Sequence, residues 1–295
     1  MIKLTFSSKT KEELSKLNNL ANKDQVQAEF LGYLISDNAS IENDMVKYPT
    51  ESEYNINRFS KLLNNMNILD YEIDMSGNIF IISFNKDFIE TLVNIHNGKI
   101  YITEVKNNED YIKALVRGVF LGSGSMNNPE KVYHLELSLS TKESLELIFN
   151  LLQEMEIYFK VLESNNSYSL YIKEGEEISK FLAFIGANSS VLKFEEIRVM
   201  RHMNNKVNRL VNCKTANMNK TMNAAVEQIE AIEYLKKIKE FEKLDESLKE
   251  IAIVRIEHPD SPLSELGKYL KEPIGKSGVN YRLKRIIEIA EELKK

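Results

Sequence analysis

The pattern of apolar and polar positions is clearest near the C-terminal end of the chain. Leu263, Leu266 and Leu270 recur at helical spacing, and residues 271–275 contain the proline and glycine of a turn. A second amphipathic helix is predicted to begin near Ser277. Two short helices separated by a tight turn indicate a helix-turn-helix.

The boundaries of this unit carry their own signals. Ser261 is predicted to cap the first of these helices, with Pro262 in its first position. An earlier helix is predicted between Asp245, as N-cap, and the break at His258-Pro259. Together the three helices form a tri-helical unit.

Polar residues face outward from the second helix of the turn motif. Such a helix can reach base edges and phosphates when it lies in the major groove of DNA, and the alternative is a three-helix bundle that binds nothing. The predicted DNA-binding residues are Lys276, Ser277, Asn280, Tyr281, Arg282 and Lys284.

The first two-thirds of the chain contains an internal repeat. Residues 61–68 read KLLNNMNI and residues 150–157 read NLLQEMEI, with the leading leucines 89 residues apart. Each copy is preceded by a capping box, at 50–53 and at 140–143. The repetition predicts two helices in equivalent places of a duplicated domain.

Alternating apolar positions surround each repeated helix. Strand-like runs precede it at 39–48 and 133–139, and pairs of strands follow it. The predicted pairs are 69–75 with 78–84, turning at Ser76-Gly77, and 158–162 with 168–172, turning at 165–166. A closing helix is predicted in each copy, near 87–95 and 176–185.

Each copy starts with an apolar helix that carries one glycine. These helices are predicted at 26–37, with Gly32, and at 111–122, with Gly118. A small residue lets two such helices pack closely about a pseudo-two-fold axis. Each copy therefore reads α-β-β-α-β-β-α, and the paired sheets would form a saddle for a duplex or, alternatively, a domain without a ligand.

Composition limits the class of protein. The chain has 295 residues, enough for about two domains, and 43% of them are hydrophobic. Cys213 is the single cysteine, and the four histidines lack the spacing of a zinc site. The N-terminus has no apolar signal core and no run is long enough to span a membrane, so we expect a cytoplasmic protein.

Positive charge is concentrated in one segment although the net charge is −5. Residues 193–220 carry seven basic and two acidic residues, interleaved with asparagines that can bond to phosphate or sugar. A solvated helix face is the alternative. The predicted phosphate-contacting residues are Arg201, Lys206, Arg209, Lys214 and Lys220.

These features resemble the LAGLIDADG homing-endonuclease fold and, more closely, the bacterial WhiA family. The resemblance covers nearly the whole chain and is strongest in VRGVFLGSGSMNNPEKVYHLEL (116–137), NRLVNCKTANMNKTMNAA (208–225) and GKSGVNYRL (275–283). It implies an α+β fold, a duplicated LAGLIDADG-like domain followed by an all-α helix-turn-helix domain. It also implies DNA binding, transcription regulation, and roles in sporulation, cell division and chromosome segregation.

The resemblance also bears on nuclease activity. LAGLIDADG nucleases hold divalent metal with an acidic residue at the end of each motif helix. Asp37 keeps that position in the first copy, whereas Ser123 occupies it in the second. A serine hydroxyl is a poor ligand for Mg²⁺, so we predict no catalytic residues, no metal, no cofactor and no enzymatic activity.

The predicted organisation has three parts. Residues 1–200 form the duplicated domain, with copies at about 20–97 and 109–187; residues 201–243 form a basic, asparagine-rich linker helix; and residues 244–295 form the helix-turn-helix domain. The expected partner is double-stranded DNA in the nucleoid, with transcription or division proteins as further candidates. The rival hypotheses are a metal-dependent endonuclease using Asp37 and a protein-interaction scaffold.

Overall fold

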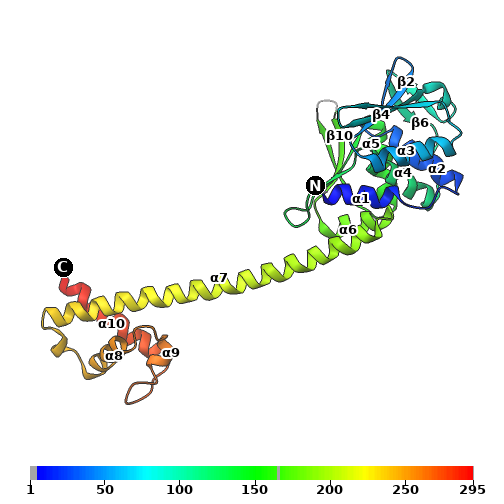
Figure 1. Ribbon diagram of the computed structural model, residues 1–295. Coiled ribbons are helices and arrows are strands. Elements are labelled where there is room, and N and C mark those ends of the chain that lie inside the picture. Colours follow the sequence, from blue (N-terminus) through cyan, green and yellow to red (C-terminus); the bar gives the residue numbers. More distant parts are fainter. Residues whose placement is uncertain (1–4, 165–166, 295) are drawn as a thin grey trace. The chain divides into compact units, whose positions relative to one another are not determined.

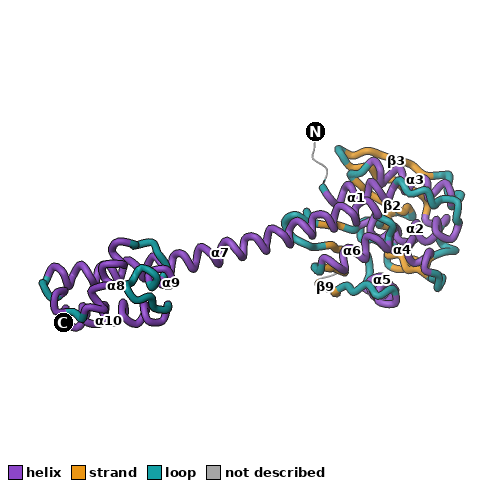
Figure 2. The backbone as a smooth tube through the Cα atoms, turned by 90° about the horizontal axis from the view of Figure 1, so that it is seen from below, coloured by secondary structure: helices purple, strands orange, loops and turns teal. Residues whose placement is uncertain are grey.

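The computed structural model describes residues 5–164 and 167–294 (Figure 1). The chain divides into two compact units, residues 1–202 and residues 203–295. Both β-sheets and the hairpin lie in the first unit, whereas the second is helical (Figure 2). None of the helices in the described residues is long and apolar enough to cross a membrane.

The first unit contains both copies of the repeat, preceded by α1 (Phe6–Ser15). The first copy comprises α2 (Lys23–Leu34), β1 (Ser40–Glu42), β2 (Met45–Thr50), α3 (Glu53–Asn65), β3 (Tyr71–Ser76), β4 (Ile79–Asn85), the 3₁₀ helix η1 (Lys86–Phe88), β5 (Val93–His96) and β6 (Lys99–Ile102). The second comprises α4 (Glu109–Ser123), β7 (Ser125–Met126), β8 (Leu135–Leu139), α5 (Lys142–Glu154), β9 (Lys160–Ser164), β10 (Ser167–Ile172) and α6 (Gly175–Phe184). The long helix α7 (Asn188–Lys237) follows and continues into the second unit.

The two four-stranded sheets have the same antiparallel order. The first runs β1-β2-β4-β3 and the second runs β7-β8-β10-β9. Equivalent buried pairs hold the two registers, such as Tyr48 opposite Ile82 and Leu137 opposite Leu170. The matching topology confirms the predicted duplicated α+β fold.

Helices α2 and α4 cross at the centre of the first unit, where glycine permits their backbones to touch. A Cβ atom on Gly32 would lie 2.1 Å from the carbonyl oxygen of Leu115, and one on Gly118 would lie 2.1 Å from that of Glu29. Any side chain at either position would therefore force the helices apart. The single glycine in each motif helix is thus explained by the crossing.

A buried ionic cluster reinforces this crossing. Glu29 of α2 is fully buried and accepts from Arg58 of α3, with Nε–Oε1 at 2.6 Å and Nη2–Oε2 at 2.9 Å. Arg117 of α4 reaches the same carboxylate at 3.1 Å and donates from Nε to the carbonyl oxygen of Ile185 at 2.8 Å. One carboxylate therefore ties both copies together.

The end of the first copy differs from the prediction. The prediction of a closing helix near 87–95 is wrong. Only the short η1 forms there, and residues 93–102 make the hairpin β5–β6. Asn97 and Gly98 adopt positive φ angles of 50° and 70°, which allow a two-residue hairpin turn. The second copy does close with a helix, α6, so the two copies diverge at this point.

Smaller details of the repeat also differ. The run 39–48 is two strands, β1 and β2, separated by a turn at Asn43 and Asp44. In both predicted capping boxes the N-cap is not the first residue. Ser52 caps α3 in the box at 50–53, and Thr141 caps α5 in the box at 140–143. The turn predicted at 165–166 lies outside the described residues.

In the second unit, the C-terminal part of α7 packs against a bundle of three further α-helices. Its further elements are η2 (Phe241–Lys243), α8 (Glu246–Glu257), α9 (Leu263–Leu266) and α10 (Lys276–Lys294). Ile232 and Leu235 of α7 are buried with Ile251, Leu266 and Leu283 in one core. The predicted helix-turn-helix is confirmed, with the C-terminal part of α7 completing its core.

One of the two predicted caps in this unit is wrong. Asp245 is the N-cap of α8, as predicted, although its side chain makes no capping hydrogen bond. Pro262, rather than Ser261, is the N-cap of α9, which is one turn long. The carbonyl oxygen of Ser261 instead accepts from the buried Arg255 at 2.9 Å.

Candidate nucleic-acid interface

The turn before α10 sets the direction of this helix. A Cβ atom on Gly267 would lie 2.2 Å from the carbonyl oxygen of Ile274, so glycine allows α9 to contact the turn directly. The backbone nitrogen of Ile274 donates to the carbonyl oxygen of Gly267 at 3.1 Å. Val279 and Leu283 then bury one side of α10 and leave the other side in solvent.

Five of the six residues predicted on α10 are exposed: Lys276, Ser277, Asn280, Tyr281 and Lys284. At 100° per residue, Ser277, Asn280, Tyr281 and Lys284 share one side of the helix, with Lys276 at its start. Arg282 instead points towards α8, where Nη1 lies 3.5 Å from the carbonyl oxygen of Ser247.

Arg285 was not among the predicted residues although it continues the exposed side of α10. It lies one turn after Tyr281 and pairs with Glu288 at 3.2 Å, with its side chain 46% exposed. The spacing of four residues from Tyr281 was the signal available in the sequence. Arg285 therefore adds to the candidate interface on α10, and the role of Arg282 there stays a prediction.

The basic residues predicted in the linker do not share one face. Lys206, Arg209, Lys214 and Lys220 are all exposed on α7. Helical periodicity places Lys206, Arg209 and Lys220 on one side and Lys214 on the far side of the helix.

Arg201 has partners within the first unit. Its guanidinium lies 4.2 Å from the centre of the Tyr133 ring, and Nη1 donates to the carbonyl oxygen of Pro129 at 2.7 Å. It is therefore held in place and is less available to a phosphate than the other basic residues on α7.

The C-terminal ends of the two glycine-containing helices, α2 and α4, lie close together, as the repeat predicts. The backbone nitrogen of Asp37 donates to the carbonyl oxygen of Ser138 at 3.2 Å, and the Ser123 hydroxyl donates to the same oxygen. Asn38 also donates to the carbonyl oxygen of Gly122 at 2.7 Å. Asp37 and Ser123 therefore lie near one another, one from each copy.

This arrangement does not fit a two-metal centre. The exposed Asp37 offers one carboxylate, whereas the Ser123 hydroxyl is already engaged with a backbone carbonyl. Within residues 5–164 and 167–294, no group of three or more His, Cys, Asp or Glu side chains could hold a metal ion. A nuclease centre would need a second anionic oxygen here.

The solvent-facing sides of the sheets are not basic. Strand alternation places Glu72 and Asp74 of β3 on the side opposite the buried Ile82 and Phe84. Across both sheets the charged residues of this side are Glu42, Lys47, Glu72, Asp74, Glu136 and Lys160. Both lysines are already in ion pairs, with Glu42 and with Glu174, at 2.8 Å each. The expected contact between the sheets and a phosphate backbone therefore lacks electrostatic support.

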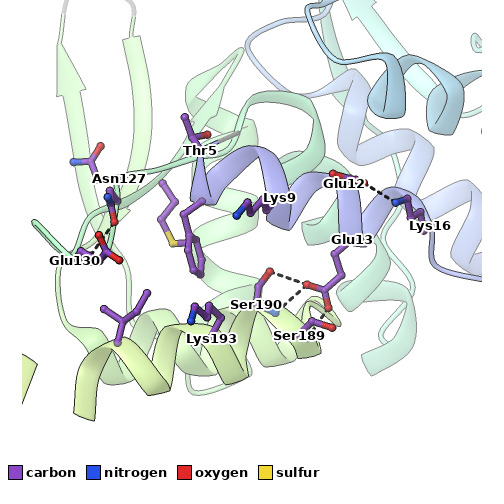
Figure 3. A pocket seen from close by; sticks show the side chains of 14 residues that line it. Thr5, Lys9, Glu12, Glu13, Lys16, Asn127, Glu130, Ser189, Ser190 and Lys193 are labelled. Atoms are coloured by element: carbon purple, nitrogen blue, oxygen red, sulfur yellow. Dashed lines mark hydrogen bonds and ion pairs between the residues drawn. The ribbon is translucent and has the colours of Figure 1, made fainter. Parts of the chain in front are cut away.

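A pocket of about 790 Å³ lies beside α1 and the start of α7 (Figure 3). Glu13 accepts from the backbone nitrogens of Ser189 and Ser190 at 2.6 and 2.9 Å and so occupies the N-terminus of α7. Lys16 pairs with Glu12 at 2.6 Å. Glu12, Glu13 and Lys16 are therefore already engaged within the protein.

Two family models match the chain, one in each compact unit for most of its length. The model of the WhiA LAGLIDADG-like domain matches residues 112–204, and the model of the WhiA C-terminal HTH domain matches residues 207–290.

Individual relatives belong to the same family, and two of them match over nearly the whole chain. A protein of Clostridium acetobutylicum named "Probable cell division protein WhiA" is 36% identical over 99% of this chain and 99% of its own length. One of the same name from Clostridium botulinum is 48% identical over 62% of this chain and 58% of its own. The crystal structure of full-length DUF199/WhiA from Thermatoga maritima is 30% identical, covers 98% of this chain and 99% of that one, and has a TM-score of 0.59.

Proposed function

The chain belongs to the WhiA family, and from this premise we propose that it is a sequence-specific DNA-binding protein that regulates transcription in cell division and chromosome segregation. It acts in the cytoplasm, at the nucleoid. The observation that carries the proposal is the polar, basic side of α10. Asn280, Tyr281 and Lys284 are exposed there on a helix anchored by its apolar side.

The proposed division of labour follows three segments. Residues 1–200 form the LAGLIDADG-like domain, and residues 201–243 form the basic linker. Residues 244–295 form the helix-turn-helix domain, which contacts the bases. In the linker, the exposed Lys206, Arg209 and Lys220 are positioned for phosphates on a shared side of α7. Phosphate contacts set the position of the protein, and contacts to base edges give specificity.

The LAGLIDADG-like domain acts without catalysis in this proposal. Asp37 follows the end of α2, whereas α4 ends in Ser123, whose hydroxyl already donates to the carbonyl oxygen of Ser138. A rival function, cleavage of DNA with a metal held by Asp37, has the exposed carboxylate in its favour. A second rival, a scaffold for division proteins, has the acidic sheet sides in its favour.

The test of DNA reading is footprinting of the full chain on its genomic DNA, followed by titration of Asn280→Ala. A lost base contact should weaken the footprinted site by ~1–3 kcal/mol and leave binding to random duplex at the same salt unchanged. Equal losses on both duplexes would show that Asn280 contacts only the backbone. The absence of any footprint would favour the scaffold.

The test of catalysis uses supercoiled plasmid carrying the footprinted site, with Mg²⁺ or Mn²⁺. We expect no nicking. Nicking that disappears in Asp37→Asn would support the endonuclease and overturn the proposal.

A further inference from the structure

Asparagine recurs along one side of α7 in the second unit. Asn205, Asn208, Asn212, Asn219 and Asn223 follow one another at intervals of 3, 4, 7 and 4 residues, which is the spacing of a single helix face. All five are exposed. Below, these five residues are called the asparagine stripe.

The stripe is not explained by the stability of the helix. Asparagine is a poor residue for a helix interior because its side chain competes with the backbone for hydrogen bonds. In the described part of the chain none of the five amides has a protein partner, whereas Asn217, on the far side of α7, lies 3.8 Å from the Cys213 sulfur. Five unfavourable residues on one face indicate a ligand for that face.

The surrounding charge points to a polyanion. Between Glu196 and Glu227 the chain contains no acidic residue and six basic ones. Arg209 and Lys220 lie on the side of the helix that adjoins the stripe. The opposite side carries the exposed Val207, Leu210 and Met218, and its one basic residue is Lys214, so it offers less to a polyanion.

We propose that the asparagine stripe is a second base-reading element, in which Asn205, Asn208 and Asn212 contact adenine edges in the major groove of double-stranded DNA. This inference rests on the proposed DNA-binding function. An asparagine side chain presents one N–H donor group and one oxygen acceptor together, which match N7 and N6 of adenine. The major groove admits an α-helix, and these three residues lie on successive turns. Arg209 holds the adjacent phosphate, while Asn219 and Asn223 lie further along the strand.

The decisive comparison is between Asn212→Ala and Asn217→Ala in the full chain. Both remove one exposed asparagine from the same helix, and both should preserve or raise thermal stability because alanine favours helix. At the footprinted site Asn212→Ala should lose about 5- to 150-fold in affinity, as should Asn208→Ala. Asn217→Ala should bind as the wild type does, and none of the three should alter binding to random duplex.

A base analogue identifies the contacted atom. Replacing single adenines of the site with 7-deazaadenine, which keeps pairing but lacks N7, should weaken the wild type at the contacted position. The same replacement should have no effect on Asn212→Ala at that position. A duplex RNA of the same sequence should bind worse, because its deep, narrow major groove excludes side chains.

The outcomes separate this inference from the proposed function. If Asn280→Ala weakens the specific site but Asn208→Ala and Asn212→Ala do not, the stripe does not read bases and only this inference is overturned. Equal losses on specific and random duplex would make the stripe a backbone contact and overturn it as well. If the wild type prefers no site at all, both the inference and the proposed function are overturned.

Discussion

The centres of the two units solve the same packing problem with different polar chemistry. Each brings helices or turns together through a glycine, Gly118 in the first unit and Gly267 in the second, and each buries an arginine. In the first unit the buried Arg58 meets the carboxylate of Glu29. In the second, Arg255 meets only carbonyl oxygens, those of His258, Pro259 and Ser261, at 3.5, 3.2 and 2.9 Å.

The buried arginines therefore have different structural roles in the two units. A buried carboxylate shared by Arg58 and Arg117 joins three helices and is costly to disturb, because each charge depends on the others. A buried arginine bonded to carbonyls closes one turn, between α8 and α9, and so sets the direction in which α10 leaves the core. The first unit is joined at its centre across the repeat, whereas the second presents a helix to solvent.

The largest effect is expected from a side chain at the α2–α4 crossing. Gly118→Val would place a branched side chain 2.1 Å from a backbone carbonyl oxygen, which cannot move without displacing α2. We expect the first unit to lose at least about 4 kcal/mol of its free energy of unfolding. Hydrogen exchange should show lost protection in residues 5–202 and retained protection in the second unit.

The matched control is Gly275→Ala, since no atom lies within 4 Å of a Cβ at that position. Its effect should stay within about 1 kcal/mol. A comparable loss in Gly275→Ala, or a tolerated Gly118→Val, would refute the packing argument.

Removing the shared carboxylate should have the next largest effect. Glu29→Ala leaves Arg58 and Arg117 buried without a counter-charge, and we expect a loss of ~3–5 kcal/mol in chemical denaturation. Glu12→Ala removes the partner of the exposed Lys16 and should cost much less, because water screens an ion pair at the surface. Similar losses in both variants would mean that burial of the cluster contributes nothing.

Arg255→Met should have a smaller and local effect. It removes the donor to three carbonyl oxygens but fills the buried space, so a loss of ~1–3 kcal/mol is expected in the second unit alone. Specific DNA binding should fall with the fraction of folded second unit. The exposed Arg285→Met should leave stability within about 0.5 kcal/mol, and unfolding of the first unit by Arg255→Met would contradict the separation of the two centres.

The smallest effect concerns pH and the first unit. Burial lowers the pKa of Lys11, which lies near the Phe120 ring, from 10.5 to about 8. Protonated Lys11 therefore destabilises the folded state below about pH 8, and this cost disappears as the pH rises towards 10.5. Wild type should gain about 1 kcal/mol relative to Lys11→Met between pH ~7.5 and ~8.7 in chemical denaturation. Parallel pH profiles of the two proteins would show that Lys11 keeps its ordinary pKa when folded.

Much of the architecture could be predicted because it depends on local periodicity. The repeat appeared in KLLNNMNI and NLLQEMEI, and α3 and α5 lie where those segments predict them. The hairpin β5–β6 was missed because the prediction extended the repeat to residues 87–95, where the chain turns at Asn97 and Gly98. The N-cap of α8 lies at Asp245, as predicted, whereas the caps of α3 and α5 lie inside the predicted capping boxes but after their first residue, because adjacent hydroxyl residues satisfy the same sequence pattern.

The candidate interface, too, could be predicted only in part from local periodicity. The exposed side of α10 followed from the apolar spacing of Val279, Leu283 and Ile286, which orients the remaining residues by geometry. The position of Arg282 on the boundary of that pattern does not reveal its contact with Ser247 of α8, so its role in DNA binding stays a prediction. Arg201 was assigned to DNA by its charge, whereas the structure places it against Tyr133, which is distant in sequence.

The sequence by itself determined the duplication and the helix-turn-helix. These are properties of residue type and spacing, which act over one or two turns of a helix or strand. Only the tertiary structure decided which polar groups are available to a partner. The carboxylate of Glu29 and the guanidinium of Arg201 are engaged by residues far along the chain, and the solvent-facing sides of the sheets acquire their acidity from separate strands. Whether a polar side chain is free to bind a partner depends on its contacts with residues distant in sequence, and these contacts form only when the chain folds.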